Sequence, residues 1–141
     1  MPTVSKSVLV PRSAEQMFAL VDDVEDYPQF LPWCPAARVL ERNDELTRAC
    51  LEIDYHGLRT HFTTVNRKQA PRRMDLELEE GPFERLKGRW SFTPLGEEGS
   101  RVELTLDYEL EGRALNRVVA PVLAQIMETL VDRFVARAES L

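Results

Sequence analysis

Two histidines, His56 and His61, are the side chains of this sequence that could serve as a base near neutral pH. His56 precedes Gly57 in an expected turn, and His61 lies on the wet side of an expected strand. With Asp54 they could chelate a metal across a hairpin, but two histidines without a third defined ligand are a weak metal pattern. We therefore interpret both histidines as solvated and expect no metal site.

Two cysteines, Cys34 and Cys50, are the other groups with reactive chemistry, and they form no CxxC or zinc-ligand spacing. Cys34 lies in a Pro-Trp-Cys-Pro turn, where a small buried thiol is the common arrangement. The sequence contains no P-loop, GxGxxG, GxSxG or HExxH motif, so nucleotide binding and hydrolase chemistry gain no support. We expect no catalytic residues and no required cofactor.

The composition is that of one globular domain spanning residues 1–141. The chain is 43% hydrophobic and 30% charged, with a net charge of −6, which excludes disordered and collagen-like proteins. No stretch approaches the ~18 apolar residues of a membrane span, and the first residues contain no apolar signal core. Together with the unpaired cysteines, these features indicate a cytoplasmic protein without a transmembrane segment.

The elements that must position any site begin with a strand and a helix. A β-branched strand covers Val4 to Val10 and ends at Pro11. Ser13 and Gln16 then form a capping box, and apolar residues follow at helical spacing. The sequence therefore predicts a short helix directly after the first strand.

A second capping box follows, with Asp26 and Gln29 as its members. It encloses Pro28 in the first helical turn, where a missing N–H costs little. The spacing predicts a one-turn helix over Tyr27 to Leu31 that ends at Pro32.

Between Arg38 and Leu110 the hydrophobic period changes to two, so each expected strand has one apolar and one wet face. Turn residues at positions 56–57, 81–82 and 96–99 separate these strands. The outward charges, taken in chain order, run acidic, basic, acidic, basic, acidic. Opposite charges stabilise neighbouring strands, so this alternation predicts a meander in which each strand pairs with the next.

The C-terminal segment returns to a helical period, with one broad apolar face from Leu115 to Ala138. An apolar stripe of this width is typical of a helix that lies on a sheet. Pro121 lies inside the run and predicts either a kink or a delayed helix start. The layout is an α+β fold in which a curved antiparallel sheet of about seven strands wraps around one long helix, with two short helices after the first strand.

A strongly curved sheet that grips a helix can leave an apolar space, and such spaces are default ligand sites. The alternative is that the same side chains simply fill an ordinary packed core. The expected lining residues are Tyr55, Phe62, Trp90, Leu104, Met127 and Phe134.

Three groups of motifs resemble the START-like family of polyketide cyclases and coenzyme-Q-binding proteins. They are Ala-Glu-Gln-Met-Phe at 14–18 with Leu-Pro-Trp-Cys at 31–34, Gly-Pro-Phe at 81–83 with the Gly-Arg-Trp run that follows, and the ending from Met127 to Ala138. The resemblance covers nearly the whole chain. It implies a helix-grip fold and a cavity that holds ubiquinone or a related polyprenyl lipid, without catalytic residues, in support of cellular respiration.

The same resemblance leaves two other functions open. The family includes bacterial toxins that bind the 50S ribosomal subunit and block 70S assembly and translation, and, more remotely, aromatase/cyclase enzymes. The expected inward positions are nearly all apolar, so no acid–base pair for a cyclase is visible.

A gate and a surface patch complete the expected sites. Phe30, Leu31 and Trp33 sit on a short, proline-bounded element that could swing to admit a lipid tail, or could instead plug the end of the sheet. For a ribosome, Lys68, Arg72 and Arg73 are the candidate contacts, because residues 56–91 carry eight basic and five acidic side chains between acidic flanks. The alternative is a solvated sheet face whose charges pair with one another. We also expect at most transient contact with a membrane surface.

Overall fold

The computed structural model describes residues 3–55, 57–81, 83–110 and 113–140. Within these ranges, the side chains of residues 4, 110, 113–119, 123 and 127 are outside the description.

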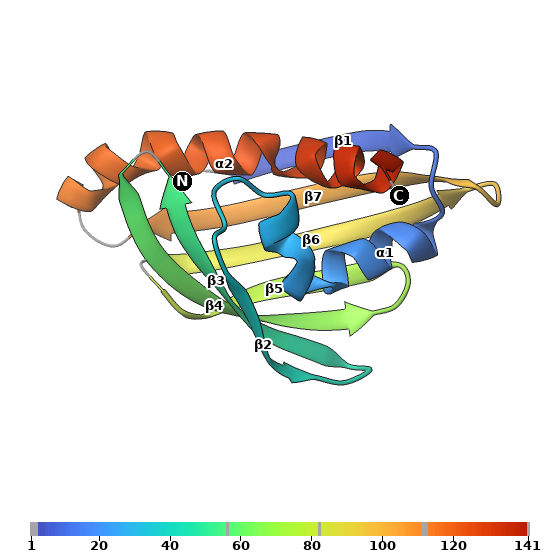
Figure 1. The fold of residues 1–141 in the computed structure, drawn as a ribbon, viewed down its shortest axis with the longest axis horizontal. Coiled ribbons are helices and arrows are strands. Elements are labelled where there is room, and N and C mark those ends of the chain that lie inside the picture. The colour runs from blue at the N-terminus through green and yellow to red at the C-terminus, as the bar shows by residue number, and fades with distance from the viewer. Residues whose placement is uncertain (1–2, 56, 82, 111–112, 141) are drawn as a thin grey trace.

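The described residues form one antiparallel sheet of seven strands in the order β1-β7-β6-β5-β4-β3-β2. Strands β2 to β7 follow one another as neighbours, so the predicted meander is confirmed, and β1 closes the other edge by pairing with β7. The sheet curves around the long helix α2, which lies along its concave side (Figure 1). The strands are β1 (Thr3–Val10), β2 (Ala37–Arg42), β3 (Leu46–Tyr55), β4 (Leu58–Gln69), β5 (Arg73–Glu80), β6 (Phe83–Leu95) and β7 (Gly99–Leu110).

Opposite charges do meet across the outer face of the sheet. Arg89 Nε lies 2.8 Å from Asp75 Oδ1 between β6 and β5. Arg85 Nη2 lies 3.0 Å from an oxygen of Asp107 on β7. Such exposed pairs each stabilise the sheet by less than about 1 kcal/mol, but their alternation along the chain favours this strand order over others.

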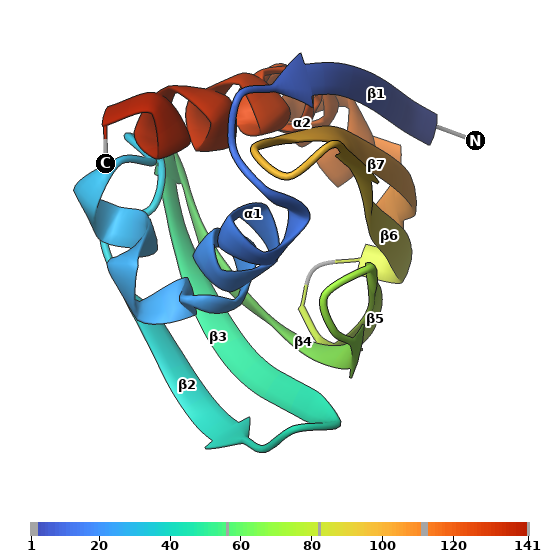
Figure 2. The same cartoon turned by 90° about the vertical axis from the view of Figure 1, so that its right-hand side faces the viewer.

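Two short helices connect β1 to β2. Helix α1 (Ala14–Asp22) begins at the predicted capping box, which is confirmed in both directions. Ser13 N donates to Gln16 Oε1 at 2.9 Å, and Gln16 N donates to Ser13 Oγ at 3.1 Å. Figure 2 shows α1 inside the curve of the sheet, below α2.

The second predicted box is wrong. The 3-10 helix η1 (Val24–Gln29) follows α1 almost directly, with Asp23 at its N-cap and no side-chain cap. Its turns are closed by backbone bonds from Asp26 N to Asp23 O and from Phe30 N to Tyr27 O, neither of which needs an amide from Pro28. The local pattern was overridden because the chain was already turning at the end of α1.

Helix α2 (Arg113–Ser140) runs without interruption through Pro121, so the proline does not delay its start. At the other end, Arg12 Nε donates to Ala138 O at 3.1 Å and its Nη2 donates to Glu139 O at 3.3 Å. A guanidinium there satisfies terminal carbonyls and complements the negative end of the helix dipole. Among the described residues, neither the length nor the apolarity needed for a membrane crossing is found in any helix.

Candidate ligand-binding cavity

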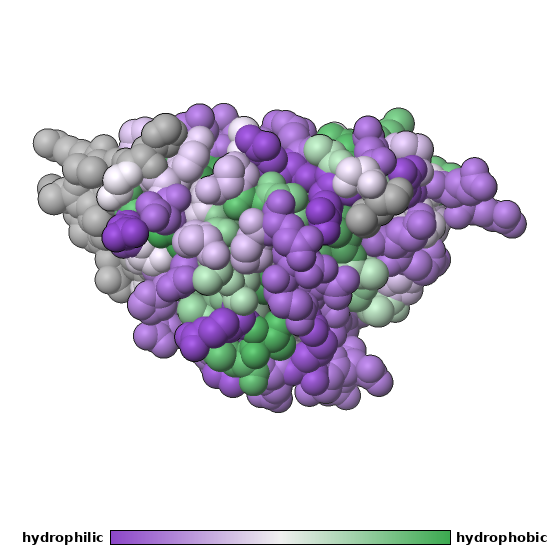
Figure 3. Space-filling model, viewed as in Figure 1, coloured by the Kyte–Doolittle hydropathy of each residue, from purple (hydrophilic) through white to green (hydrophobic). Residues whose placement is uncertain are grey.

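An internal cavity of about 80 Å³ lies between the concave face of the sheet, the later turns of α2 and the segment from α1 to the loop after η1. On the face seen in Figure 3, apolar side chains gather toward the centre, over β2, β3 and this loop, and hydrophilic ones surround them. The lining residues are Val21, Val24, Tyr27, Leu31, Trp33, Ala49, Leu51, Ile53, Phe62, Thr64, Asn66, Leu76, Leu86, Trp90, Leu106, Ile126, Leu130 and Phe134.

The described lining contains no carboxylate, lysine, arginine or histidine. Its one ionisable group is Tyr27, whose hydroxyl donates to the carbonyl of Val21. Burial raises the pKa of Tyr27 far above its ordinary value, so this phenol stays neutral. The cavity therefore offers no acid–base pair and no counter-charge for an ion.

Two polar side chains on β4, Thr64 and Asn66, lie in the lining among the apolar ones. Both are buried, and Thr64 Oγ1 donates to Asn66 Oδ1 at 2.8 Å. From the sequence, inward-facing residues of this strand are predicted only as far as Phe62. Extending the same alternation by four residues would have placed both side chains on the cavity side.

Trp33 is the second source of polarity. Its side chain lines the cavity and is 5% exposed, and within the described part of the chain its Nε1–H has no acceptor. The backbone is held in place because Trp33 O accepts from Asp54 N at 2.9 Å. This anchor fixes the backbone of Trp33 beside the end of β3.

The structure brings five of the nine sequence-predicted lining and gate residues to the cavity wall. They come from the loop after η1, from β4, from β6 and from α2. These residues are Leu31, Trp33, Phe62, Trp90 and Phe134.

Of the other four, three lie outside the lining and one has a side chain that the structure does not describe. Phe30 packs its ring on Phe134 at a centroid distance of 5.2 Å, with the Arg137 guanidinium 5.4 Å above its own centroid. Leu104 is fully buried in the closed core, and Tyr55 is half-buried at the end of β3; neither is part of the lining. The side chain of Met127 lies outside the described residues. Phe30, Leu31 and Trp33 follow η1 in a loop and are not part of a helix, contrary to expectation.

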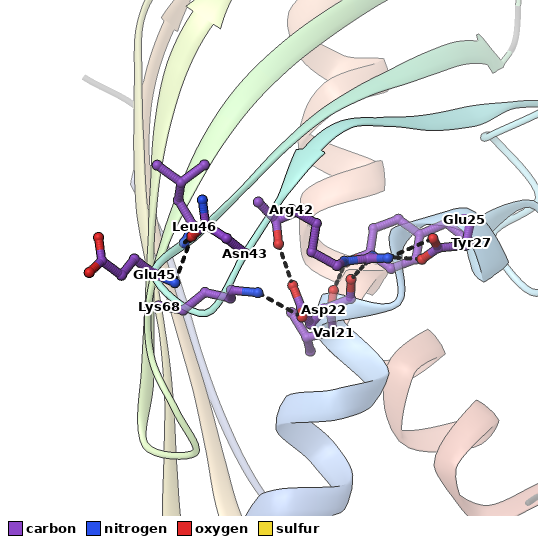
Figure 4. Close-up of polar contacts among 10 residues, drawn as sticks. Val21, Asp22, Glu25, Tyr27, Arg42, Asn43, Glu45, Leu46 and Lys68 are labelled. Atoms are coloured by element: carbon purple, nitrogen blue, oxygen red, sulfur yellow. Dashed lines mark hydrogen bonds and ion pairs between the residues drawn. The ribbon is translucent and has the colours of Figure 1, made fainter.

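Lys68, one of the expected surface contacts, has a side chain that is only 7% exposed. Its Nζ lies 3.1 Å from Asp22 Oδ2 (Figure 4). The other carboxylate oxygen of Asp22 accepts from Thr47 Oγ1 at 2.8 Å. The group joins the end of α1 to β3 and β4. Lys68 is thus an internal ion-pair partner and does not present a charge to a surface partner.

Beside this group, Arg42 holds the start of η1 against β2 (Figure 4). It donates to both carboxylate oxygens of Glu25, at 2.8 and 2.7 Å, and to Asp22 O at 2.8 Å. The segment before the loop is therefore fixed by charge-assisted bonds.

The remaining expected contacts behave differently from each other. Arg73 is half-buried and its Nη2 lies 3.4 Å from Asp75 Oδ2, whereas Arg72 is exposed in the turn between β4 and β5. Of the three expected basic contacts, Arg72 is the one that carries an exposed charge without a described ion-pair partner.

The cysteines and histidines that could carry reactive chemistry have ordinary positions. Cys34 is buried, and this burial raises the pKa of its thiol to about 11, so the thiolate is scarce at neutral pH. His61 is exposed, and His56 lies outside the described residues. Among the residues that are described, no three His, Cys, Asp or Glu side chains gather as a metal site.

Two relatives match all or nearly all of the chain. It is 38% identical over 141 residues to the "ribosome association toxin RatA" of Escherichia coli strain K12, covering 100% of this chain and 89% of the relative. It is also 25% identical over 146 residues to the mitochondrial "coenzyme Q-binding protein coq10" of Schizosaccharomyces pombe, covering 94% and 84% of the two chains.

Solved structures share the fold. A START superfamily protein from Mycobacterium smegmatis matches with a TM-score of 0.82 and 26% identity over 98% of this chain and 97% of the other. The Zhui aromatase/cyclase from Streptomyces sp. R1128 matches with a TM-score of 0.85 but 18% identity, over 98% and 93%, and supports the fold alone.

The helix-grip architecture predicted from the resemblance is confirmed by these matches. Residues 10–135 match the family model described as polyketide cyclase / dehydrase and lipid transport. The chain, whose curved sheet and long helix enclose an apolar cavity, belongs to this family.

Proposed function

We propose that the protein binds a neutral hydrophobic ligand, ubiquinone or a related polyprenyl lipid, in the cavity between sheet and α2, and that it supports cellular respiration in this way. The observation that carries the proposal is an internal cavity whose described lining is apolar and free of ionic groups. Burial of a prenyl tail contributes ~0.8 kcal/mol per CH₂ group, so affinity needs few polar contacts. The name of the S. pombe relative, a coenzyme Q-binding protein, is consistent with this ligand class.

The ligand must enlarge the cavity. A volume of about 80 Å³ is well below the roughly 300–1,000 Å³ of ordinary small-molecule pockets and is too small for a quinone ring with its tail. We assign the opening to the loop after η1, because it contributes Leu31 and Trp33 to the wall and belongs to no helix or strand. Phe30 and Arg137 cover it from outside.

The proposed activity is binding without catalysis. General acid–base chemistry needs a titratable group within hydrogen-bond reach of the substrate. In the described wall the one such group is Tyr27, which is already bonded to Val21. An aromatase/cyclase reaction therefore has no support in this cavity.

The proposal is tested by mass spectrometry of lipid that copurifies from the native host, followed by titration with a short-tailed ubiquinone. Ala49, 2% exposed in the wall, offers a blocking variant, because Ala49→Leu adds three carbons to the cavity. We expect A49L to reduce binding at least tenfold, whereas Ala19→Leu on the exposed side of α1 should leave it unchanged. Absence of copurified lipid together with no titratable binding would overturn the proposal.

A second candidate function is association with the 50S ribosomal subunit, which would block 70S assembly and translation. It is favoured by the relatives named ribosome association toxin, which match at 38% identity over essentially the full chain in E. coli and in Pseudomonas aeruginosa. Of the expected contacts, Arg72 remains available in the turn after β4. The two functions are compatible, since a bound lipid could stabilise a ribosome-binding protein.

Sucrose-gradient sedimentation of ribosomes with added protein tests this second function. We expect free subunits to accumulate, and Arg72→Ala to weaken the effect several-fold. Arg133 is an exposed arginine on α2, away from this turn, and Arg133→Ala serves as the charge-matched control. Unchanged subunit association with the wild-type protein would exclude the toxin function. A cytoplasmic location, with transient contact at a membrane surface for lipid exchange, is part of the same proposals.

A further inference from the structure

Two hydrogen-bond donors in the cavity wall have no acceptor among the residues that the structure describes. Trp33 Nε1–H is buried and has none within the described residues. Indole nitrogen only donates, so this group cannot be satisfied by a donor from elsewhere. On β4, Asn66 Oδ1 already accepts from Thr64 at 2.8 Å, and none of the described residues accepts from Asn66 Nδ2.

Buried polar groups in folded proteins are almost always paired, so the buried, unpaired indole N–H of Trp33 in the wall of a cavity calls for an external acceptor. The wall supplies both donors in otherwise apolar surroundings, where a hydrogen bond is stronger than in water. A ligand oxygen at either position would complete the bonds that the protein leaves open.

The charge of that acceptor is restricted by the wall. A carboxylate or phosphate placed there would be buried without a counter-charge, because the described lining contains no cationic side chain. Lys68, two residues beyond Asn66 on β4, is already neutralised by Asp22 at 3.1 Å. The acceptor must therefore be neutral.

We infer that the cavity selects ligands that carry a neutral carbonyl oxygen, as in a quinone, ketone or ester, and that Trp33 Nε1 and Asn66 Nδ2 donate to it. This inference rests on the proposed binding of a hydrophobic ligand and specifies its polar part. It makes Trp33 a recognition residue as well as a part of the wall.

Three small probes of similar shape separate the alternatives: tetramethyl-1,4-benzoquinone, the hydrocarbon 1,2,4,5-tetramethylbenzene, and 2,3,5,6-tetramethylbenzoate. The sequence contains two tryptophans, so two indole N–H signals are expected in a ¹H–¹⁵N spectrum, and a Trp90→Phe variant assigns them. We expect the quinone to move the Trp33 indole signal downfield. The hydrocarbon should bind without that shift, and the benzoate should bind at least tenfold more weakly than the quinone.

Calorimetry of variants provides the second readout. Trp33→Phe keeps an aromatic wall without the donor, and Asn66→Leu removes the amide at similar size. Each should lower the ratio of quinone to hydrocarbon affinity about three- to tenfold, the net effect of one hydrogen bond. The affinity for the hydrocarbon corrects for any change in packing. If a variant does not fold, the shift of the Trp33 indole signal in the wild-type protein still tests whether the quinone accepts a hydrogen bond.

The outcomes are distinct. If neither the quinone nor the hydrocarbon binds, the proposed function itself fails. If both bind equally and neither shifts the Trp33 signal, hydrophobic binding stands and the carbonyl selectivity is overturned. Binding of the benzoate as tight as that of the quinone would overturn the requirement for a neutral acceptor.

Discussion

The two faces of the sheet are built from alternate residues of the same strands, yet their electrostatics are opposite. On β6, the outward Arg89 pairs with Asp75, while the adjacent Trp90 lies in the cavity wall. The outer face consists of exposed ion pairs, each weak, whereas the inner face excludes charge from the described lining. The comparison shows that the outer residues favour a strand order and the inner ones define what can be bound.

One ion pair lies on the inner side of the sheet, away from these outer pairs. Asp22 and Lys68 lie on the inner side, with side chains 18% and 7% exposed, whereas the side chains of the outer pairs Arg85–Asp107 and Arg89–Asp75 are 34–55% exposed. In low dielectric a charge that loses its partner is costly, while in water it is not. Substitutions at matched pairs can therefore measure how different the two faces are.

The largest effect is expected for Lys68→Met, which leaves the Asp22 carboxylate without its cation. We expect the free energy of unfolding to fall by about 3 kcal/mol in urea titrations. The matched outer variant, Arg89→Met, should lose less than about 1 kcal/mol. Adding Asp22→Asn to Lys68→Met should recover part of the loss, since no charge then remains. Equal losses at Lys68 and Arg89 would contradict the distinction between the faces.

An intermediate effect is expected for Gly88→Ala on the inner face of β6. An added Cβ would lie 2.5 Å from Leu106 Cδ2 and 3.3 Å from Leu76 Cδ1, both side chains of the cavity wall. We expect a loss of about 1–3 kcal/mol on unfolding and weaker ligand binding, because the leucines are pushed into the cavity. The exposed Gly57, where an added Cβ meets nothing within 4 Å but φ is +86°, serves as a control for backbone effects alone. Full ligand affinity in G88A would show that the two leucines move elsewhere.

The smallest effect is expected for Glu25→Gln at the start of η1. Hydrogen bonds from Arg42 hold the pKa of Glu25 below its ordinary value of 4.5. A lowered folded-state pKa contributes stability above the unfolded value and loses it as pH falls through the folded value. Between about pH 7 and about pH 3 the wild type should therefore lose slightly more stability than E25Q, slightly because both side chains are partly exposed. Identical pH profiles in urea unfolding would mean that the pair contributes nothing.

The two predicted capping boxes show when a local sequence pattern is enough to predict a helix start and when it is not. Ser13 with Gln16 predicted the start of α1, because the residues before it form a strand that has to end. Asp26 with Gln29 is the same kind of pattern but failed, since the chain enters η1 from Asp23 at the end of α1. There the two side chains only contact each other, Gln29 Nε2 lying 3.3 Å from Asp26 Oδ1.

The alternation of apolar and charged residues was enough to predict the antiparallel meander, the long covering helix and an apolar interior, since these depend on periodicity and on contacts between neighbouring strands. The family resemblance, too, was visible in the motifs alone. The role of Lys68 could not be predicted from the sequence, because its partner Asp22 is 46 residues away and a lysine is normally expected at the surface. The unpaired indole N–H of Trp33 likewise became visible only in the folded structure, because whether a buried group has a partner depends on every element that packs around it.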